Sequence, residues 1–148
     1  MKMNKNKNLL LWIVFVAFIF ISPSLSLANE KENILNIALN ETEKYNLKLE
    51  SNPIIKDLTL PDDLNSPQWG PITASCQETG YDLFSYAGQT LTVITYQISE
   101  VYMKEPLSVS ILVKNNACVG AYIHVRENSL MAPGIFRVNK FLADKKDT

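Results

Sequence analysis

The sequence predicts an α+β protein in which two helices pack on an antiparallel sheet of three to five strands. The densest β-forming composition lies between Gly80 and Ile123, where three runs have the spacing of strands. Two segments with helical spacing precede these runs, one after residue 28 and one ending at Gly80. Two helices followed by so few strands argue against a jelly roll and favour the α+β class.

Residues 1–28 have the pattern of a secretory signal peptide. Three lysines precede an apolar run from Leu9 to Ile21, and Ser26-Leu27-Ala28 then places small residues at the positions that a signal peptidase reads. The run is short for a membrane-spanning helix, which needs about 20 residues. We therefore expect cleavage after Ala28 and a secreted or extracytoplasmic protein. The competing interpretation is an uncleaved N-terminal anchor, which would be the chain's only contact with a membrane.

Charge and length describe what remains after cleavage. The 148 residues carry 14 basic and 15 acidic side chains, and removing the three lysines of the signal peptide leaves 11 against 15. Residues 29–148 are thus mildly acidic, with a net charge near −4, and have the size of one domain. They hold no basic cluster to follow a phosphate backbone, so we expect no nucleic-acid partner.

The two helices are predicted from capping and periodicity. Asn29 and Glu32 fit a helix start, and the helix should end near Asn46. Its apolar face would hold Ile34, Leu35, Ala38, Leu39, Thr42 and Tyr45. The second helix should cover Pro71 to Thr79 and stop at Gly80, with a core face made of Ile72, Cys76 and Thr79.

The strands follow from alternation and turn residues. Pro53 cannot donate to a strand ladder, so a strand here should begin after it or lie at an edge of the sheet, and we expect a short strand that ends at Pro61. Gln89 to Ile98 is apolar on both faces, which predicts a strand covered on both sides or one that carries a bulge. The next two strands contain Leu107–Val113 and Ala117–Val125. Residues 135–138 fit a short edge strand, and residues 143–148 a disordered tail.

The register of the last hairpin can be predicted from its apolar face. A three-residue loop, Lys114-Asn115-Asn116, pairs Val113 with Ala117 and Ile111 with Val119, which unites the apolar residues of both strands. Asn116 then takes the left-handed position of the loop. Cys118, Tyr122 and His124 would lie on the opposite, more polar face.

Asp82 to Gly88 reads as a turn before the first long strand. We expect Asp82 to accept hydrogen bonds from backbone amides near Phe84 and Ser85, as a cap does. Tyr86 should pack beneath the sheet. The alternative is a site in which both side chains face a concavity.

The two cysteines, Cys76 and Cys118, leave two interpretations open. In an exported domain they can form a disulfide, and closing so long a loop would stabilise by up to about 4 kcal/mol. Alternatively, they are two small apolar side chains in packed positions.

Several motifs resemble a known family. Gly80-Tyr81-Asp82-Leu83, Tyr86-Ala87-Gly88, Thr95-Tyr96 and Val119-Gly120-Ala121 are similar to a family of small exported domains from Gram-positive bacteria, catalogued as a domain of unknown function. The resemblance covers roughly Leu47 to Leu130. Where that family tends to have a second glycine and an acidic residue, this chain has Ala121 and Tyr122, so the resemblance transfers no acidic site.

The sequence offers few candidates for chemistry. With one histidine, His124, it predicts neither a metal site nor a cofactor, and Asp62-Asp63 fits a turn better than a calcium loop. A cysteine–histidine pair would have to join Cys76 to His124. Aromatic residues could instead form a stacking platform for sugars or peptides, and the candidates for ligand contact are Trp69, Tyr81 and Tyr122.

These observations favour a non-catalytic binding or interaction module at the bacterial cell envelope. Its partner would be an envelope protein or a polysaccharide. The alternative is a small secreted hydrolase that uses dispersed carboxylates such as Asp82 and Glu100.

Overall fold

The computed structural model describes residues 28–126 and 135–136, and within them the predicted α+β class is confirmed. A helix occupies residues 28–44. It is followed by β1 (Ile54–Thr59), α2 (Gly70–Glu78), the 3-10 helix η1 (Leu83–Tyr86), β2 (Thr90–Tyr102), β3 (Glu105–Lys114), β4 (Ala117–Val125) and β5 (Ile135–Phe136). The predicted signal peptide, apart from Ala28, and the predicted C-terminal tail lie outside the described residues.

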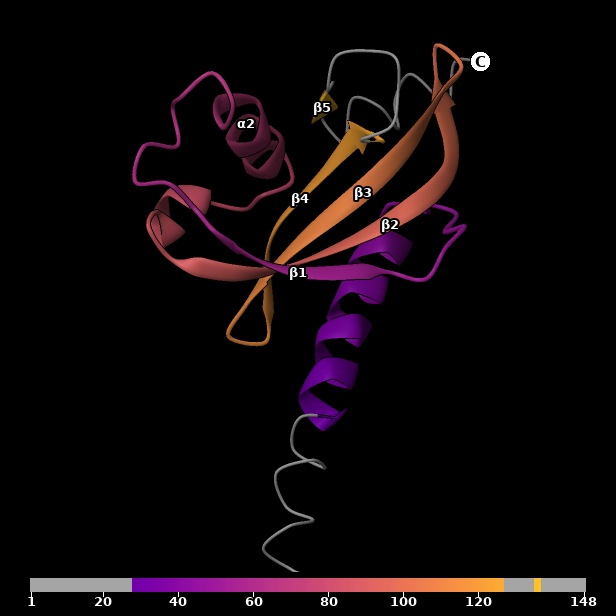
Figure 1. Ribbon diagram of the computed structural model, residues 1–148, viewed down its shortest axis with the longest axis horizontal. Coiled ribbons are helices and arrows are strands. Elements are labelled where there is room, and N and C mark those ends of the chain that lie inside the picture. Colours follow the sequence, from indigo (N-terminus) through magenta and orange to yellow (C-terminus); the bar gives the residue numbers. More distant parts are fainter. Residues whose placement is uncertain (1–27, 127–134, 137–148) are drawn as a thin grey trace, which may run out of the picture. The chain divides into compact units, whose positions relative to one another are not determined.

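Five strands form one antiparallel sheet in the order β1-β2-β3-β4-β5 (Figure 1). The sheet belongs to the compact unit that begins at Leu35. β1 begins directly after Pro53 and lies at the edge of the sheet, as predicted. The predicted edge strand at residues 135–138 is present as the two-residue β5.

From residue 35 onward the first helix presents a small, buried face. Ala38 and Thr42 are buried, and Asn46 ends the helix in the left-handed conformation with φ 51°, as predicted. The placement of Leu39 on the apolar face is wrong, because this side chain is 38% exposed while Glu41 is buried. The buried face is centred on Ala38 and Thr42, and each helical residue is turned about 100° from the one before it, which carries Leu39 off that face.

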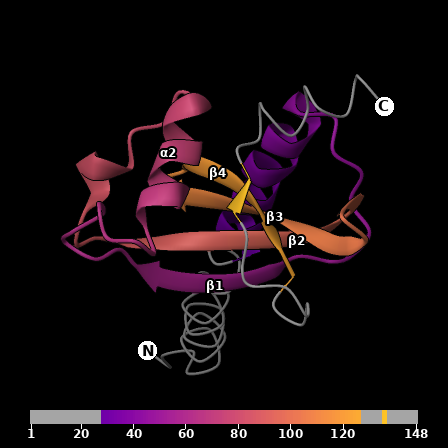
Figure 2. The same cartoon turned by 90° about the horizontal axis from the view of Figure 1, so that it is seen from above.

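The two faces of the sheet carry different side chains. Ile94, Tyr96, Val109, Ile111 and Ile123 alternate along β2, β3 and β4 on one face and are all buried. α2 lies on the other face of the sheet (Figures 1 and 2). None of the helices in the described part of the chain combines the length and apolar character needed to span a membrane.

α2 covers only one end of its face. There Cys76 packs with Leu83 from η1, Leu112 from β3 and their neighbours in a buried core cluster. Gly120 allows this close approach, because a Cβ atom built on it would lie 2.8 Å from the Cys76 sulfur. Ile72 and Cys76 face the core as predicted, whereas Thr79 is only half-buried.

The predicted loop of the β3–β4 hairpin is wrong. The turn has two residues, Asn115 and Asn116, with φ values of 51° and 58°, so the left-handed conformation predicted for Asn116 is confirmed. Val113 pairs with Cys118, and a register shift then pairs Leu112 with Gly120. Beyond this bulge the alternation is restored, so Val109 and Ile111 share one face with Ala121 and Ile123, whereas Val119 belongs to the core cluster with Cys76. The bulge also puts Cys118 on the face of Val113, not on the predicted polar face.

β2 is longer than predicted and has both features that its sequence allowed. It extends to Tyr102, its register shifts between Gln97 and Val101, and residues on both of its faces are buried.

Candidate functional site

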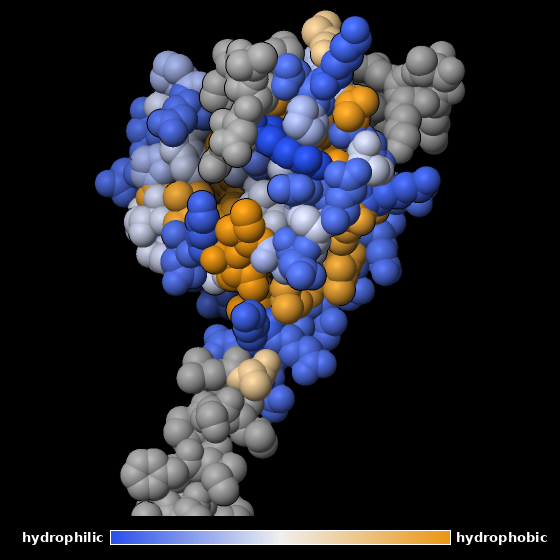
Figure 3. All heavy atoms as spheres, turned by 45° about the vertical axis from the view of Figure 1, so that its right-hand side comes forward, coloured by the Kyte–Doolittle hydropathy of each residue, from blue (hydrophilic) through white to orange (hydrophobic). Residues whose placement is uncertain are grey.

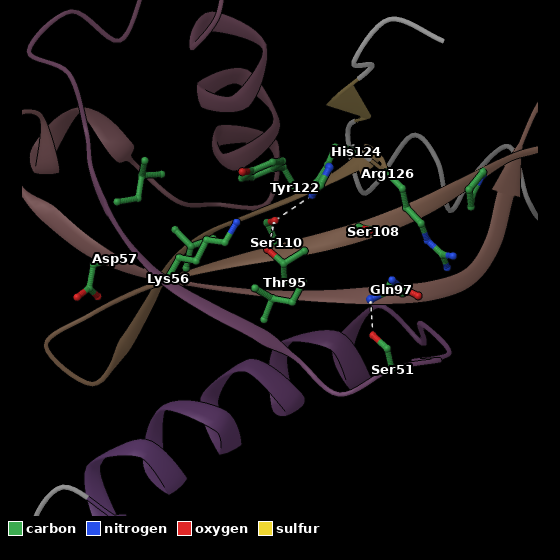
Figure 4. Close-up of a pocket in the computed structure, with 14 residues that line it drawn as sticks. Ser51, Lys56, Asp57, Thr95, Gln97, Ser108, Ser110, Tyr122, His124 and Arg126 are labelled. Atoms are coloured by element: carbon green, nitrogen blue, oxygen red, sulfur yellow. Dashed lines mark hydrogen bonds between the residues drawn. The ribbon is translucent and has the colours of Figure 1, made fainter. Parts of the chain in front are cut away.

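The end of the sheet that α2 leaves uncovered forms a pocket of about 550 Å³ (Figure 4). Alternate residues of four adjacent strands point into it, because side chains two apart on a strand share a face. Its described lining residues are Ser51, Ile54, Lys56, Asp57, Leu58, Val93, Thr95, Gln97, Pro106, Ser108, Ser110, Tyr122, His124 and Arg126. Leu58 and Val93 make one side apolar, and most of the remainder is polar.

A chain of hydrogen bonds crosses the floor of the pocket from β2 to β4. Thr95 Oγ1 lies 2.8 Å from Ser110 Oγ, and Ser110 Oγ lies 3.0 Å from His124 Nε2. The strand register creates this chain, because Ser110 is directly opposite Thr95 on one side and Tyr122 on the other.

The direction of these hydrogen bonds can be assigned. His124 Nδ1 lies 3.0 Å from the carbonyl oxygen of Val125, which can only accept, so Nδ1 carries the proton. In the neutral ring Nε2 is then the acceptor, and Ser110 donates to it. Having used its only proton, Ser110 accepts from Thr95.

Tyr122 adds a second hydroxyl next to this chain. Its ring is tilted against that of His124, with 5.5 Å between the ring centroids. Burial raises the pKa of the Tyr122 phenol, and the Ser110 side chain acts in the opposite direction. The phenol therefore keeps its proton at neutral pH and can donate a hydrogen bond into the pocket.

Two cationic side chains stand at the pocket, and they are held differently. Arg126 is fixed by Glu50 at 2.8 Å and by the carbonyl oxygens of Ile98 and Leu107 at 3.1 and 3.2 Å. Lys56 is exposed, and within the described part of the chain it forms no ion pair. Figure 4 shows it extending over the sheet toward Ser110 and Tyr122. Its neighbour Asp57 instead accepts a hydrogen bond from Thr92 at 3.2 Å.

Of the three predicted ligand-contact residues, Tyr122 lines the pocket. Trp69 is half-buried and packs against the core cluster at the start of α2. Tyr81 also packs against this cluster, and the Lys44 ammonium lies 5.5 Å from the centre of its ring. The structure therefore does not bring the three aromatic residues together in this pocket.

The cysteines are both free in the structure. Cys76 lies on the α2 side of the sheet with its sulfur 3.6 Å from the carbonyl oxygen of Ala121, whereas the bulge turns Cys118 to the other face. Burial raises the pKa of the Cys76 thiol to about 12, which keeps it protonated and a poor nucleophile. His124 instead has its Nε2 beside Ser110, so the site pairs the histidine with a hydroxyl.

The acidic residues considered from the sequence as candidates for chemistry lie outside the pocket, at a helix cap, at a bulge and in a turn. Asp82 accepts a hydrogen bond from the Phe84 amide at 3.0 Å and from the Ser85 hydroxyl at 2.8 Å, so its predicted capping role is confirmed. Tyr86 is half-buried against the core cluster. Glu100 is buried at the bulge of β2, and Asp63 accepts from the amide of Asn65 in a turn. Among the described residues no cluster of His, Cys, Asp and Glu could hold a metal ion.

Sequence reasoning missed most of the pocket. Ser108 and Ser110 occupy the polar positions of an alternating strand, and no local pattern connects them with Thr95, Gln97, Lys56 or Arg126. A usable signal was present, since small hydroxyl residues at two successive inward positions of a central strand leave room above the sheet. Compared with protein-family models, curated proteins and solved structures, the chain shows no significant similarity to any of them.

Proposed function

We propose that this protein is an exported, non-catalytic binding module whose pocket on the α2 face holds an anionic sugar unit of a cell-envelope polysaccharide. Export is expected from the N-terminal sequence, and the pocket supplies the binding chemistry. A volume of about 550 Å³ leaves room for a small ligand or for one or two units of a longer chain.

The observation that carries the proposal is the position of Lys56. Its ammonium reaches over a floor of neutral hydrogen-bonding groups, and no carboxylate neutralises it within the described residues. A ligand carboxylate there would gain a charge-assisted hydrogen bond. The Tyr122 hydroxyl and the Gln97 amide can bond to the hydroxyl groups of a sugar, and the oxygen of Thr95 can still accept a hydrogen bond.

The apolar side of the pocket fits the same class of ligand. Leu58 and Val93 line it next to the polar floor. Sugar rings present carbon-bound hydrogens on their faces and hydroxyls at their edges, so a surface with both characters is suited to them. The polysaccharide is therefore favoured over a protein partner for this pocket.

The proposal is tested by calorimetric titration of the full chain, kept in solution by a mild detergent, with glucuronate and with glucose as the neutral counterpart. Glucuronate should bind more tightly. Lys56→Met keeps most of the apolar stem but removes the charge, and the loss of a charged hydrogen bond, about 1.5–3 kcal/mol, predicts roughly tenfold to a hundredfold weaker binding.

Lys48→Met is the matched control, because Lys48 is exposed and does not line the pocket. It should leave the affinity unchanged. Equal binding of the two sugars, or equal effects of the two lysine variants, would show that the pocket does not select an anion through Lys56. Binding of neither sugar would favour a protein partner.

One observation supports a second candidate, a hydrolase acting through Ser110. The 3.0 Å contact between Ser110 Oγ and His124 Nε2 is the geometry of a serine nucleophile and its general base. The carbonyl of Val125 would orient the imidazole. Against this, Ser110 is only 2% exposed, which restricts the approach of a substrate carbonyl.

A fluorophosphonate probe distinguishes the two candidates, since it labels an activated serine irrespective of the natural substrate. A hydrolase should be labelled in a way that Ser110→Ala abolishes and Ser108→Ala preserves. Ser108 is the fitting control because it lies on the same face of β3 and is also buried. Absence of labelling would exclude the serine hydrolase and retain the binding module as the candidate function.

A further inference from the structure

The turn that joins β2 to β3 has an unusual backbone for its sequence. Tyr102 pairs with Glu105, so the turn consists of Met103 and Lys104, with φ values of 50° and 71°. Two successive left-handed residues form the turn that best matches the twist of a hairpin. The conformation normally selects Asn, Asp or Gly, because other side chains crowd the backbone in it.

A second turn of the same geometry in this chain has the residues that the conformation favours. The β3–β4 hairpin has the same two-residue, left-handed geometry, and there the residues are Asn115 and Asn116. Methionine and lysine are less favourable in this conformation. Their presence is explained if the side chains at the β2–β3 turn have a role that asparagine cannot fill, since strained backbone is often retained at functional sites.

Three large hydrophobic side chains and one lysine are exposed at this tip. Val101 is 63% exposed, Tyr102 37% and Met103 69%, and Lys104 is exposed as well. Figure 1 shows the hairpin projecting at the upper right of the sheet. In Figure 3, which brings this side forward, only small hydrophobic areas lie among hydrophilic residues in the upper part of the view.

The size of this patch limits what it can bind. Three side chains expose a few hundred Å² at most, whereas a stable protein interface buries ~800 Å² on each partner. A bilayer surface requires no such area, because a few apolar side chains on a narrow tip can enter it. The composition also fits: valine and methionine suit the acyl boundary, while a tyrosine hydroxyl and a lysine ammonium suit the headgroup level.

We propose that the β2–β3 tip, residues 101–104, inserts into the headgroup region of a lipid bilayer. The N-terminal apolar run supports a membrane as the occupant, because a signal peptide directs the chain to a membrane for export and an uncleaved segment would hold it there. The tip adds a contact made by the folded domain itself. Residues 101–104 do not line the pocket, and of the residues that follow the tip only Pro106 does so before Ser108. This inference is therefore independent of the sugar-binding proposal.

The test is fluorescence quenching in vesicles of phosphatidylcholine with brominated acyl chains. Met103→Trp places an indole at the tip, and Asn115→Trp places one at the other turn of the same geometry. Both are made in the full chain and reconstituted identically, and the emission of the wild-type chain, with its own Trp12 and Trp69, is subtracted. Insertion predicts a loss of the added emission for Met103→Trp and no loss for Asn115→Trp.

Equal quenching of the two indoles, or none at position 103, would overturn the proposal. A second variant tests the premise of strain. Replacing Met103 by Asn together with Lys104 by Gly should raise the urea midpoint of unfolding, because the turn loses its unfavourable residues. An unchanged or lower midpoint would mean that the turn is not strained, and the argument for a functional tip would fail.

Discussion

The close contact between α2 and β4 yields the sharpest prediction about stability. A Cβ atom on Gly120 would lie 2.8 Å from the Cys76 sulfur, 2.9 Å from Leu112 Cδ1 and 3.1 Å from Leu83 Cδ2. All three neighbours are fully buried, so none can move aside into solvent. Gly120→Ala should therefore lower the free energy of unfolding by about 1–3 kcal/mol, the usual cost of overpacking a core.

The contact with Cys76 can be isolated with a double mutant. Cys76→Ala alone removes one buried sulfur and should cost about 1 kcal/mol. In the double variant the new methyl group occupies space that the sulfur has left, so the combined loss should be smaller than the sum by roughly 0.5–3 kcal/mol. Urea titration of the four proteins at neutral pH measures this coupling.

Gly70→Ala is the matched control for the glycine substitution. A Cβ atom there would be 3.7 Å from its nearest neighbour, an ordinary contact, and the residue lies at the start of α2. The free energy of unfolding of the Gly70→Ala variant should be unchanged or higher, since alanine has a higher helix propensity than glycine. A neutral Gly120→Ala, or effects of Gly120→Ala and Cys76→Ala that simply add, would refute the packing described for α2 and β4.

Three further predictions concern single residues. Asp82→Ala should lower the free energy of unfolding by about 0.5–2 kcal/mol in urea, because it removes the cap of η1; a change within error would mean that the cap adds no stability. Asn116→Gly should be neutral or stabilising and Asn116→Val should cost about 1 kcal/mol or more, because φ is 58° there; equal midpoints would contradict a left-handed residue. Burial raises the Cys76 pKa from 9.0 to about 12, so the folded protein keeps a proton that the unfolded chain loses. The stability gained from this group is complete below about pH 9 and declines toward about pH 12, with a loss of about 1.4 kcal/mol at about pH 10. Cys76→Ala should flatten that decline in urea titrations at about pH 8 and about pH 10, and parallel pH profiles for the two proteins would show that the thiol titrates normally.

Local chemistry explains why much of the fold could be predicted. Asn46, Gly80 and Asn116 mark chain reversals through their tolerance of the left-handed conformation, and all three adopt it. Alternation along Leu107–Val113 correctly separated the apolar from the polar face. These signals act over a few residues and do not depend on the rest of the molecule.

The errors concern relations between distant residues. A two-residue turn with a bulge and a three-residue loop both place Val109 and Ile111 on the same face as Ala121 and Ile123, so the alternation of these residues does not distinguish the two loops. The bulge lies next to Gly120, where Cys76 of α2 packs closely, and this long-range contact leaves no local signal in the sequence. Leu39 was misplaced for a similar reason, since the helix rotates to suit its neighbours.

The pocket could not be predicted from the sequence, because it exists only where α2 does not cover the sheet. α2 is short and packs over the end of the sheet that contains Leu112 and Gly120. The part of the same face that carries Thr95, Ser110 and His124 is therefore not covered by α2. Tyr122 was selected as an aromatic residue on a polar strand face, and it does lie there. Lys56 is a charged residue in an edge strand, and its importance follows only from the polar side chains that it faces across the pocket.

The central claim, that this pocket is a binding site for an anion, is tested most directly by mapping amide shifts. The full chain, labelled with ¹⁵N, is titrated with glucuronate and two-dimensional spectra are recorded. Saturable shifts should be centred on the amides of Lys56, Thr95, Ser110 and His124, which come from four adjacent strands, and Lys56→Met should abolish them. Shifts that gather elsewhere, or that persist unchanged in Lys56→Met, would contradict the account.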